Sequence, residues 1–424
     1  MRISMAITRH ILPSLLRKKT RTPEHLAPRV RKVVVSLGPP FVKLSQVVSS
    51  SPGLFPGPIS NELRYLLDDA PPEAWPKIKK AIEQRLDAPI GSLFATIDEQ
   101  PVAAASIAQV HAATLHDGTP VVVKVRRPGV ERKFLTDLRQ LRILGLLANR
   151  FWKSARVLNP VGIVDGVVAN LRIELDFNLE AASMERFEEN LRKFGDNDDV
   201  RVPIVHHSLS GPGVLTMERI DGIKVDDLPN LVATGFDLLA LLKAGVRCWI
   251  EAACEHGFFH GDVHAGNLMV DRTGKVVFLD FGIMGELDEA TRLLVRRGVV
   301  ALLYHKDFDE VTRCLVELGA QLGHRTDEAR AAAAIQRLVL PELSKSIAEI
   351  DYLALFSKAV RMAAPKGVQL PRSLVLLAKQ VLYFERYAKL VAPDYDILSD
   401  TWLIEFMIDG DDEADSEETL PVRG

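Results

Sequence analysis

The chain has 424 residues, with 53 Lys and Arg against 56 Asp and Glu, and a formal net charge of −3 at pH 7. Hydrophobic residues make up 47% and charged residues 26%. This composition indicates a globular protein with a sizeable core and two or three domains, and it excludes collagen-like and largely disordered chains. Nucleic-acid binding is not expected, because there is no overall basic excess to neutralise phosphates.

Three cysteines, Cys248, Cys254 and Cys314, are too few for a disulfide framework and lack the paired spacing of a metal site. They favour a reducing, cytosolic compartment. We expect no transmembrane helix, because no run of about 18 uncharged apolar residues occurs. The stretch 373–384 comes nearest, but Lys379 and Gln380 interrupt it, so it is predicted to be a buried or amphipathic helix.

The charge is concentrated at the two ends. Residues 1–32 contain nine Lys or Arg and one acid, whereas residues 405–418 contain eight acids and no base. The basic start carries apolar residues and could lie on an anionic membrane surface, although a solvated helix fits it equally well. The acidic segment 409–424 has few apolar residues and is expected to be disordered.

Residues 1–100 read as helices separated by Pro and Gly breaks, with helical apolar spacing over 41–48 and 59–67. The pattern changes after Pro101. Two β-branched runs, 110–115 and 121–125, flank Asp117-Gly118 and predict a β-hairpin.

Short strands and longer helices alternate in the rest of the chain. Helices are predicted over 134–152, 161–194 and 236–256, and strands over 202–206, 214–217, 267–270 and 275–279. A strand-rich section followed by a helix-rich section predicts an α+β fold. We assign 1–100 to a helical extension, 101–222 to a first lobe, 223–408 to a helical second lobe and 409–424 to the tail, with a ligand cleft expected between the lobes.

The strongest chemical signal is an aspartate, an asparagine five residues later and an Asp-Phe-Gly sequence. They occur in HGDVHAGN (260–267) and FLDFG (278–282). Phosphoryl transfer needs a carboxylate that orients the attacking hydroxyl, and hard oxygen ligands for magnesium. Asp262 fits the first role, and Asn267 and Asp280 fit the second. Their joint spacing is far more specific than an isolated Asp-Phe-Gly.

Three histidines spaced by four, His256, His260 and His264, raise the alternative of a zinc site on one helix face. Gly257 and Gly261 lie between them, and the Asp-Asn spacing requires a loop there. The sequence therefore favours a supporting role for His260 and His264 in that loop.

A kinase-like site also needs a strand lysine and a helix carboxylate that holds it. Lys124 ends the second strand of the predicted hairpin, and Glu174, Asp176 and Glu180 begin a long helical segment. An exposed lysine with surface acids would explain either motif alone. The presence of Asp262 and Asp280 downstream favours the functional interpretation.

Together these motifs resemble the UbiB/AarF family of atypical kinases, associated with coenzyme Q biosynthesis, over about residues 37–305. FVKLSQ (41–46) is similar to the family's K-x-G-Q motif, AAASIAQVH (103–111) to its alanine-rich replacement for the glycine loop, and ELD (174–176) to its E-x-D motif. Ser45, Ala108 and Ala265 depart from the family pattern. Ser45 stands for a glycine and adds a side chain where helices pack.

The resemblance implies a two-lobed protein-kinase-like fold with an N-terminal helical extension, and Glu180 as the partner of Lys124. It implies that Lys43 and Gln46, three apart on one helix face, cover the peptide cleft near Glu174 and Asp176, so that protein substrates have poor access. It also implies these nucleotide contacts: Ala103, Ala104, Ala105, Ser106, Lys124, Glu218, Asn267 and Asp280. Alanines restrict backbone freedom relative to glycines, so we expect an unusual nucleotide geometry.

The expected function is that of an atypical kinase or ATPase that uses ATP and Mg²⁺, with Lys124, Glu180 and Asp262 as catalytic residues and Asn267 and Asp280 as metal ligands. The resemblance implies a role in isoprenoid quinone metabolism, with quinone-biosynthesis enzymes or a lipid surface as partners, in the cytoplasm or peripherally at a membrane. One alternative is a small-molecule kinase of the aminoglycoside or choline type. Another is a non-catalytic regulator gated by nucleotide.

Overall fold

The computed structural model describes residues 23–37, 71–151, 173–194, 197–321, 372–393 and 400–408, and single residues at 5, 9, 10, 41, 62, 161, 165, 168, 171, 337 and 395. The chain divides into two compact units. Unit 1 comprises 1–182 and 204–219, and unit 2 comprises 183–203 and 220–424. This division differs from the predicted boundary at 222/223, because residues 183–203 belong to unit 2.

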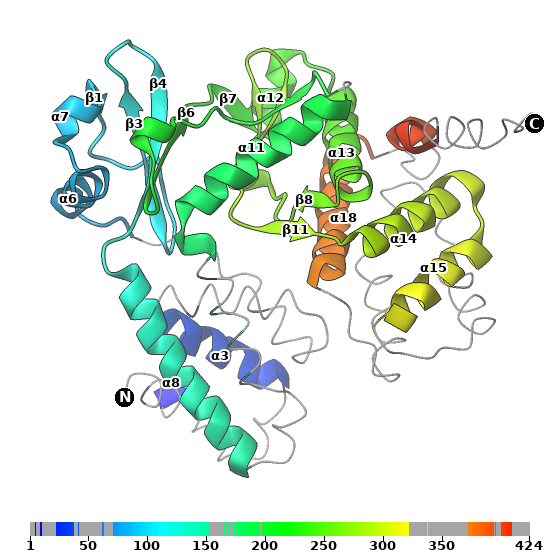
Figure 1. Cartoon of the computed structure of the whole chain (residues 1–424), viewed down its shortest axis with the longest axis horizontal. Coiled ribbons are helices and arrows are strands. Elements are labelled where there is room, and N and C mark those ends of the chain that lie inside the picture. Colours follow the sequence, from blue (N-terminus) through cyan, green and yellow to red (C-terminus); the bar gives the residue numbers. More distant parts are fainter. Residues whose placement is uncertain are drawn as a thin grey trace, which may run out of the picture. The chain divides into compact units, whose positions relative to one another are not determined.

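Unit 1 contains a five-stranded antiparallel sheet (Figure 1). Its strands are β1 (Thr96–Ile97), β2 (Ala103–Ala104), β3 (Ala108–Thr114), β4 (Pro120–Arg126) and β6 (Val214–Glu218). The order is β1-β3-β4-β6, and β2 also pairs with β3. The β3–β4 hairpin confirms the predicted one, with Val110 opposite Lys124. Because β1 pairs with β3, the sheet begins before the predicted boundary at residue 100.

The alternation along β4 decides which way Lys124 faces. Val121, Val123 and Val125 are fully buried and pack with Ile78 and Ile82, which belong to α6 (Trp75–Leu86). Side chains alternate along a strand, so Lys124 lies on the opposite face of the sheet. Three further helices of unit 1 are α3 (Pro23–Leu37), α7 (Ile90–Leu93) and α8 (Val130–Phe151).

The helix predicted over 161–194 is not continuous. Asp176 is not helical, and α11 extends over Phe177–Phe194. The Asp176 carboxylate accepts a hydrogen bond from the Asn178 N–H at 3.1 Å, so Asp176 begins a new helix rather than continuing the old one. The strand predicted over 202–206 is only partly present: Val205 forms an isolated antiparallel bridge with Met217, whereas the nearest named strand, β5, is Val200–Arg201. Pro203, which has no N–H, lies between the two.

Unit 2 contains two small sheets. One has the order β5-β10-β9-β7, with β7 (Gly222–Lys224), β9 (Leu268–Asp271) and β10 (Val276–Phe278), and the other pairs β8 (Phe258–His260) with β11 (Met284–Glu286). The β9–β10 hairpin confirms the one predicted at 267–279. Five helices of this unit are α12 (Leu228–Thr234), α13 (Leu238–Cys254), α14 (Glu289–Val300), α15 (Phe308–Gln321) and α18 (Arg372–Val391).

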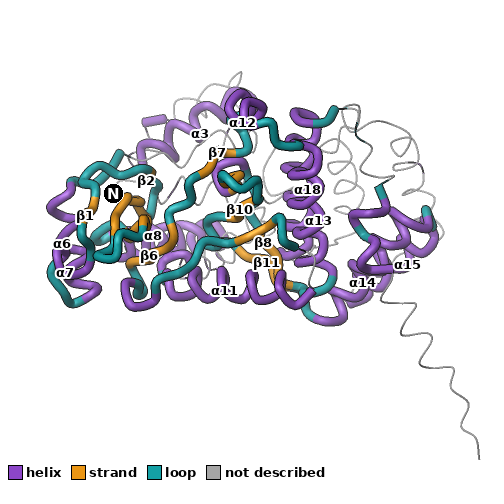
Figure 2. The backbone as a smooth tube through the Cα atoms, turned by 90° about the horizontal axis from the view of Figure 1, so that it is seen from above, coloured by secondary structure: helices purple, strands orange, loops and turns teal. Residues whose placement is uncertain are grey.

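Helices α13 and α18 lie side by side next to the β8–β11 pair (Figure 1 and Figure 2). Their contact is aromatic and buried, with the rings of Trp249 and Phe384 centred 5.5 Å apart. The predicted helix at 373–384 is confirmed as part of α18. Across the described segments, no helix has both the length and the apolar character needed to cross a membrane.

Some predicted features lie outside the described residues. These are Lys43, Ser45 and Gln46, most of the basic segment 1–32, and the acidic tail 409–424.

Candidate active site

In unit 1, Lys124 of β4 forms an ion pair with Glu180 in the first turn of α11. Nζ lies 2.6 Å from Oε1, and the two side chains are only 13% and 4% exposed. The Lys124 ammonium also lies 5.4 Å from the centre of the Phe177 ring. A buried charge is costly unless it is paired, so this geometry holds Lys124 in one orientation. The structure thus brings together the two residues that the sequence placed 56 positions apart.

The alanine-rich segment is a tight hairpin. Ala103 pairs with Val110 and Ala104 with Gln109, and the Ala105 N–H donates to the Ala108 carbonyl at 2.8 Å. None of the positions 103–106 has a positive φ, so the segment follows an ordinary β-turn path without the left-handed conformations that glycine permits.

Glu218 ends β6. Its N–H donates to the Ile204 carbonyl at 2.8 Å, and its carboxylate accepts from the Ile204 N–H at 3.4 Å. The backbone N–H of Glu218, which the resemblance implies as a nucleotide contact, is therefore already engaged by Ile204. Of the two E-x-D acids, Glu174 is half-buried and Asp176 caps α11, while their expected neighbours Lys43 and Gln46 fall outside the described residues.

In unit 2, the predicted catalytic loop connects β8 to β9. The Asn267 side chain donates from Nδ2 to the Asp262 carbonyl at 3.0 Å, so the oxygen Oδ1 is the side-chain atom suited to a metal ion. The Leu279 N–H donates to the Asn267 carbonyl at 2.8 Å. Asn267 therefore joins the Asp262 loop to the segment that carries Asp280. One amide oxygen and one carboxylate suit Mg²⁺, which takes one or two protein oxygens plus phosphates and water.

His260 stabilises this loop through two hydrogen bonds of its ring. Its Nδ1 accepts from the Asp262 N–H at 3.1 Å, so Nε2 carries the proton and donates to the Leu279 carbonyl at 3.0 Å. Burial lowers the pKa of His260, outweighing the opposite effects of the Leu279 carbonyl and the nearby Asp262 and Asp280 carboxylates. The ring is therefore neutral at pH 7.

The Asp-Phe-Gly segment has an unusual backbone. Asp280 has φ of +56°, a left-handed conformation that aspartate tolerates better than most residues. Phe281 is 1% exposed, and its ring meets His260 and Phe187 edge-on at 5.0 and 5.3 Å between centres. The buried ring anchors the segment, while the Asp280 side chain is exposed.

The three histidines have separate partners, which does not suit a shared zinc ion. His256 contacts Glu251 at 3.1 Å, and His264 accepts the Gly266 N–H at 3.0 Å. Among the described residues, no group of three or more His, Cys, Asp or Glu side chains could hold a metal ion.

Two residues of α18 join the loop without having been predicted as part of the site. The Lys379 ammonium lies 2.5 Å from the Asp262 carboxylate, and Gln380 hydrogen-bonds the loop backbone at Val263 and Gly261. The only signal in the sequence was that two polar residues interrupt an apolar helix.

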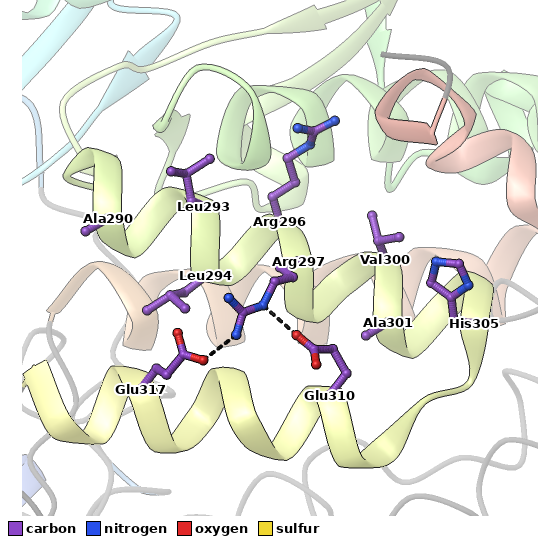
Figure 3. A pocket seen from close by; sticks show the side chains of 10 residues that line it. All are labelled: Ala290, Leu293, Leu294, Arg296, Arg297, Val300, Ala301, His305, Glu310 and Glu317. Atoms are coloured by element: carbon purple, nitrogen blue, oxygen red, sulfur yellow. Dashed lines mark hydrogen bonds and ion pairs between the residues drawn. The ribbon is translucent and has the colours of Figure 1, made fainter. Parts of the chain in front are cut away.

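A separate cavity of about 640 Å³ lies between α14 and α15 (Figure 3). Its most prominent charge, Arg297, is bound by Glu310 at 2.6 Å and Glu317 at 2.5 Å. None of the predicted site residues lines it. Arg296, which also lines the cavity, pairs with Glu255 at 2.8 Å. With both arginines paired to acids, this cavity offers no comparable chemistry.

Comparison with known proteins decides the family. The family model of the ABC1 atypical kinase-like domain matches residues 65–315. The chain belongs to this family. The ABC1 region includes Lys124, Glu180, Asp262, Asn267 and Asp280, and the resemblance to UbiB/AarF kinases drawn from the sequence is confirmed.

The sequences of its relatives align with most of the length of this ABC1 protein. An uncharacterised protein of Mycobacterium tuberculosis strain H37Rv is 42% identical over 367 residues, which covers 87% of this chain and 75% of the relative. A "Probable protein kinase UbiB" of Marinobacter nauticus is 32% identical over 378 residues, covering 88% of this chain and 68% of the relative.

Among solved structures, that of M. tuberculosis Rv3197 in complex with erythromycin matches with a TM-score of 0.56. It is 20% identical and covers 93% of this chain and 97% of that one. At this identity the match shows the fold alone. The predicted α+β, kinase-like fold of the ABC1 protein is confirmed.

Proposed function

We propose that this ABC1 protein binds ATP with Mg²⁺ and either hydrolyses it slowly or transfers its γ-phosphoryl group to a small or lipid-like acceptor. The observation that carries the proposal is the Asn267 bridge, which ties Asp262 and the Asp280 segment into one hydrogen-bonded unit. A kinase needs these three groups fixed relative to one another, because phosphoryl transfer is catalysed mainly by positioning and charge.

Each residue has a defined part in this proposal. Lys124, held by Glu180, binds the α- and β-phosphates, with the alanine-rich hairpin 103–106 close to the nucleotide and Glu218 near its adenine. Asn267 Oδ1 and the Asp280 carboxylate hold Mg²⁺, which neutralises phosphate charge when it is bound. Asp262 orients the acceptor hydroxyl or water.

Support for a role in isoprenoid quinone metabolism comes from relatives named UbiB at 32% and 35% identity. We propose a lipid-like acceptor or partner in that metabolism, and a cytoplasmic protein that associates peripherally with a membrane through its basic start. The K-x-G-Q-like segment with Lys43 and Gln46 would keep protein substrates out by meeting Glu174 and Asp176.

The central test compares Asp280→Asn with the wild type in Mg²⁺-dependent ATP binding and hydrolysis. We expect loss of Mg²⁺-dependent binding and turnover, because an amide lacks the charge that holds the ion. Asp198→Asn makes the same chemical change at an exposed aspartate of unit 2 and should leave both unchanged. Undiminished ATPase activity in Asp280→Asn would overturn the proposal.

A second candidate is a kinase for a soluble small molecule. The solved relative with the kinase-like fold is in complex with erythromycin, which favours testing macrolides, aminoglycosides and choline as acceptors. Phosphorylation of such a compound would replace the lipid acceptor in the proposal.

The other alternative is a nucleotide-gated regulator without turnover. ATPase rates with and without anionic liposomes separate the two: stimulation that requires Asp262 supports catalysis, and nucleotide-dependent liposome binding without hydrolysis supports the regulator.

A further inference from the structure

The Gln380 side chain of α18 holds the backbone on both sides of Asp262. Gln380 is completely buried. Its Oε1 accepts from the Val263 N–H at 2.7 Å, and its Nε2 donates to the Gly261 carbonyl at 2.7 Å. The backbone groups of Gly261 and Val263 thus hydrogen-bond to one side-chain amide instead of to other backbone groups. This amide fixes the path of the chain immediately before and after Asp262.

The neighbouring Lys379 holds the Asp262 side chain itself. Its Nζ lies 2.5 Å from Asp262 Oδ1, and the two side chains are 23% and 20% exposed. The second oxygen, Oδ2, lies 3.8 Å from His264 Nε2. Because Lys379 binds Oδ1, rotation of the carboxylate is restricted, and Oδ2 lies toward His264.

Further contacts fasten α18 to the same loop. The Lys379 ammonium lies 5.4 Å from the Tyr383 ring centre, and that ring is 6.4 Å from the His264 ring. Phe384 packs on Trp249, whose Nε1 donates to the His260 carbonyl at 3.0 Å. Residues 379, 380, 383 and 384 therefore share the helix face that meets residues 260–264.

We propose that Lys379 and Gln380 are positioning residues for phosphoryl transfer, with Lys379 setting the orientation and charge of the Asp262 carboxylate and Gln380 setting the path of its loop. This inference rests on the proposed kinase or ATPase function. A bare carboxylate repels an approaching phosphoryl group, and an ammonium in contact with it reduces that repulsion. The Lys379 ammonium therefore lets the Asp262 carboxylate orient an acceptor with less electrostatic repulsion of the phosphoryl group.

Hydrolysis of ATP is the step that tests this role with water as the acceptor. The water oxygen bonds to Pγ, the bond between Pγ and the bridging oxygen breaks, and ADP leaves with that electron pair. The water protons remain on inorganic phosphate and in solvent. Asp262 orients the water, and Lys379 holds Asp262.

The experiment measures the Kd for Mg-ATP and kcat for ATP hydrolysis in full-length wild type, Lys379→Met, Lys379→Arg and Lys379→Ala. We expect Lys379→Met to lower kcat by about 100-fold while the Kd for Mg-ATP changes by less than about threefold, because the lost interaction acts in the transition state. Lys379→Arg should recover part of the rate. Ethylammonium in the buffer should raise the rate of Lys379→Ala.

Lys389→Met is the matched control, since it makes the same change ten residues further along the same helix and should keep wild-type kinetics. A merely structural Lys379 would change the melting temperature without any rescue by ethylammonium. That result, or a wild-type kcat in Lys379→Met, would overturn the inference while leaving the proposed function intact. If wild-type protein neither binds Mg-ATP nor hydrolyses it, the proposed function fails and the inference falls with it.

Discussion

The backbone N–H of Asp262 donates to the Nδ1 atom of His260 at 3.1 Å. The proton on Nε2 is donated in turn to the Leu279 carbonyl, one residue before Asp280. A single neutral imidazole therefore connects the loop that carries Asp262 with the segment that carries Asp280, the residues proposed to orient the acceptor and to bind Mg²⁺. Protonation of His260 would remove its only acceptor atom and break the bond to Asp262.

This arrangement makes stability depend on pH. Burial lowers the pKa of His260 below its ordinary value of 6.5, so the unfolded chain binds a proton more readily than the folded one. The free energy of unfolding should fall as the pH decreases through 6.5. We expect a smaller decrease in His260→Gln, which cannot be protonated, in urea unfolding at pH 7.5 and 5.5. His111, whose pKa is also lowered by burial, contributes to the slope that remains. Equal slopes in both proteins would contradict the assignment to His260.

Removing one partner of the buried Lys124–Glu180 pair should destabilise the fold more than removing both partners. Lys124→Met leaves the Glu180 carboxylate, only 4% exposed, without its lysine, and we expect a loss of about 3–5 kcal/mol in the free energy of unfolding. The double variant Lys124→Met/Glu180→Leu should lose clearly less, because no buried charge is left. Denaturant unfolding of the two variants measures the difference. If the loss in the double variant equals the sum of the losses in Lys124→Met alone and Glu180→Leu alone, the two groups do not interact.

Much of the local structure could be predicted because it depends on local patterns. The β3–β4 hairpin follows from two β-branched runs around Asp117-Gly118, and the same alternation turns Lys124 away from the packed face. The relative position of Asp262 and Asn267 could also be predicted, because both lie in one short loop. Such features need no knowledge of distant parts of the chain.

The contact between Lys379 and Asp262 could not be predicted in this way. It joins residues 117 positions apart, and helical periodicity shows only that a polar residue lies on α18, not what it faces. The start of α11 was missed for a different reason. Asp176 fits a helical pattern by hydropathy, but its side chain caps the next helix, which competes with continuing the old one.

Gln380 should be sensitive to even a small chemical change. Gln380→Glu keeps size and the acceptor for the Val263 N–H, but its ionised form loses the donor to the Gly261 carbonyl and buries a charge, and Gln380→Leu loses both hydrogen bonds. Each unsatisfied buried group costs about 1–3 kcal/mol, so we expect both variants to be destabilised, Gln380→Leu by about that amount for each lost partner. Hydrogen exchange distinguishes them, because the Val263 amide should stay protected in Gln380→Glu and exchange faster in Gln380→Leu. Protection of this amide in both variants would show that Gln380 does not hold the loop.

Asp271 closes the β9–β10 hairpin with an unusual number of donors. Its Oδ1 accepts from the Thr273 N–H at 2.9 Å, the Thr273 hydroxyl at 2.7 Å and the Lys275 N–H at 3.0 Å. Its Oδ2 accepts from Arg201 Nε at 2.7 Å. Burial alone would raise the pKa of Asp271, but these hydrogen bonds outweigh it and lower the pKa from 3.8 to about 2.

This difference predicts an acid-dependent loss of stability. A carboxylate with a lowered folded-state pKa contributes fully above pH 3.8, and its contribution is lost as the pH falls from 3.8 to about 2. Its size is about 2 kcal/mol, at 1.36 kcal/mol for each unit of pKa difference. Asp271→Asn should therefore be less stable than the wild type by about this amount at pH 7, and the gap should close toward pH 2. Urea unfolding between pH 7 and 2 measures the gap, with Asp198→Asn as the exposed control; a gap that stays constant with pH would show that the loss does not come from the charge.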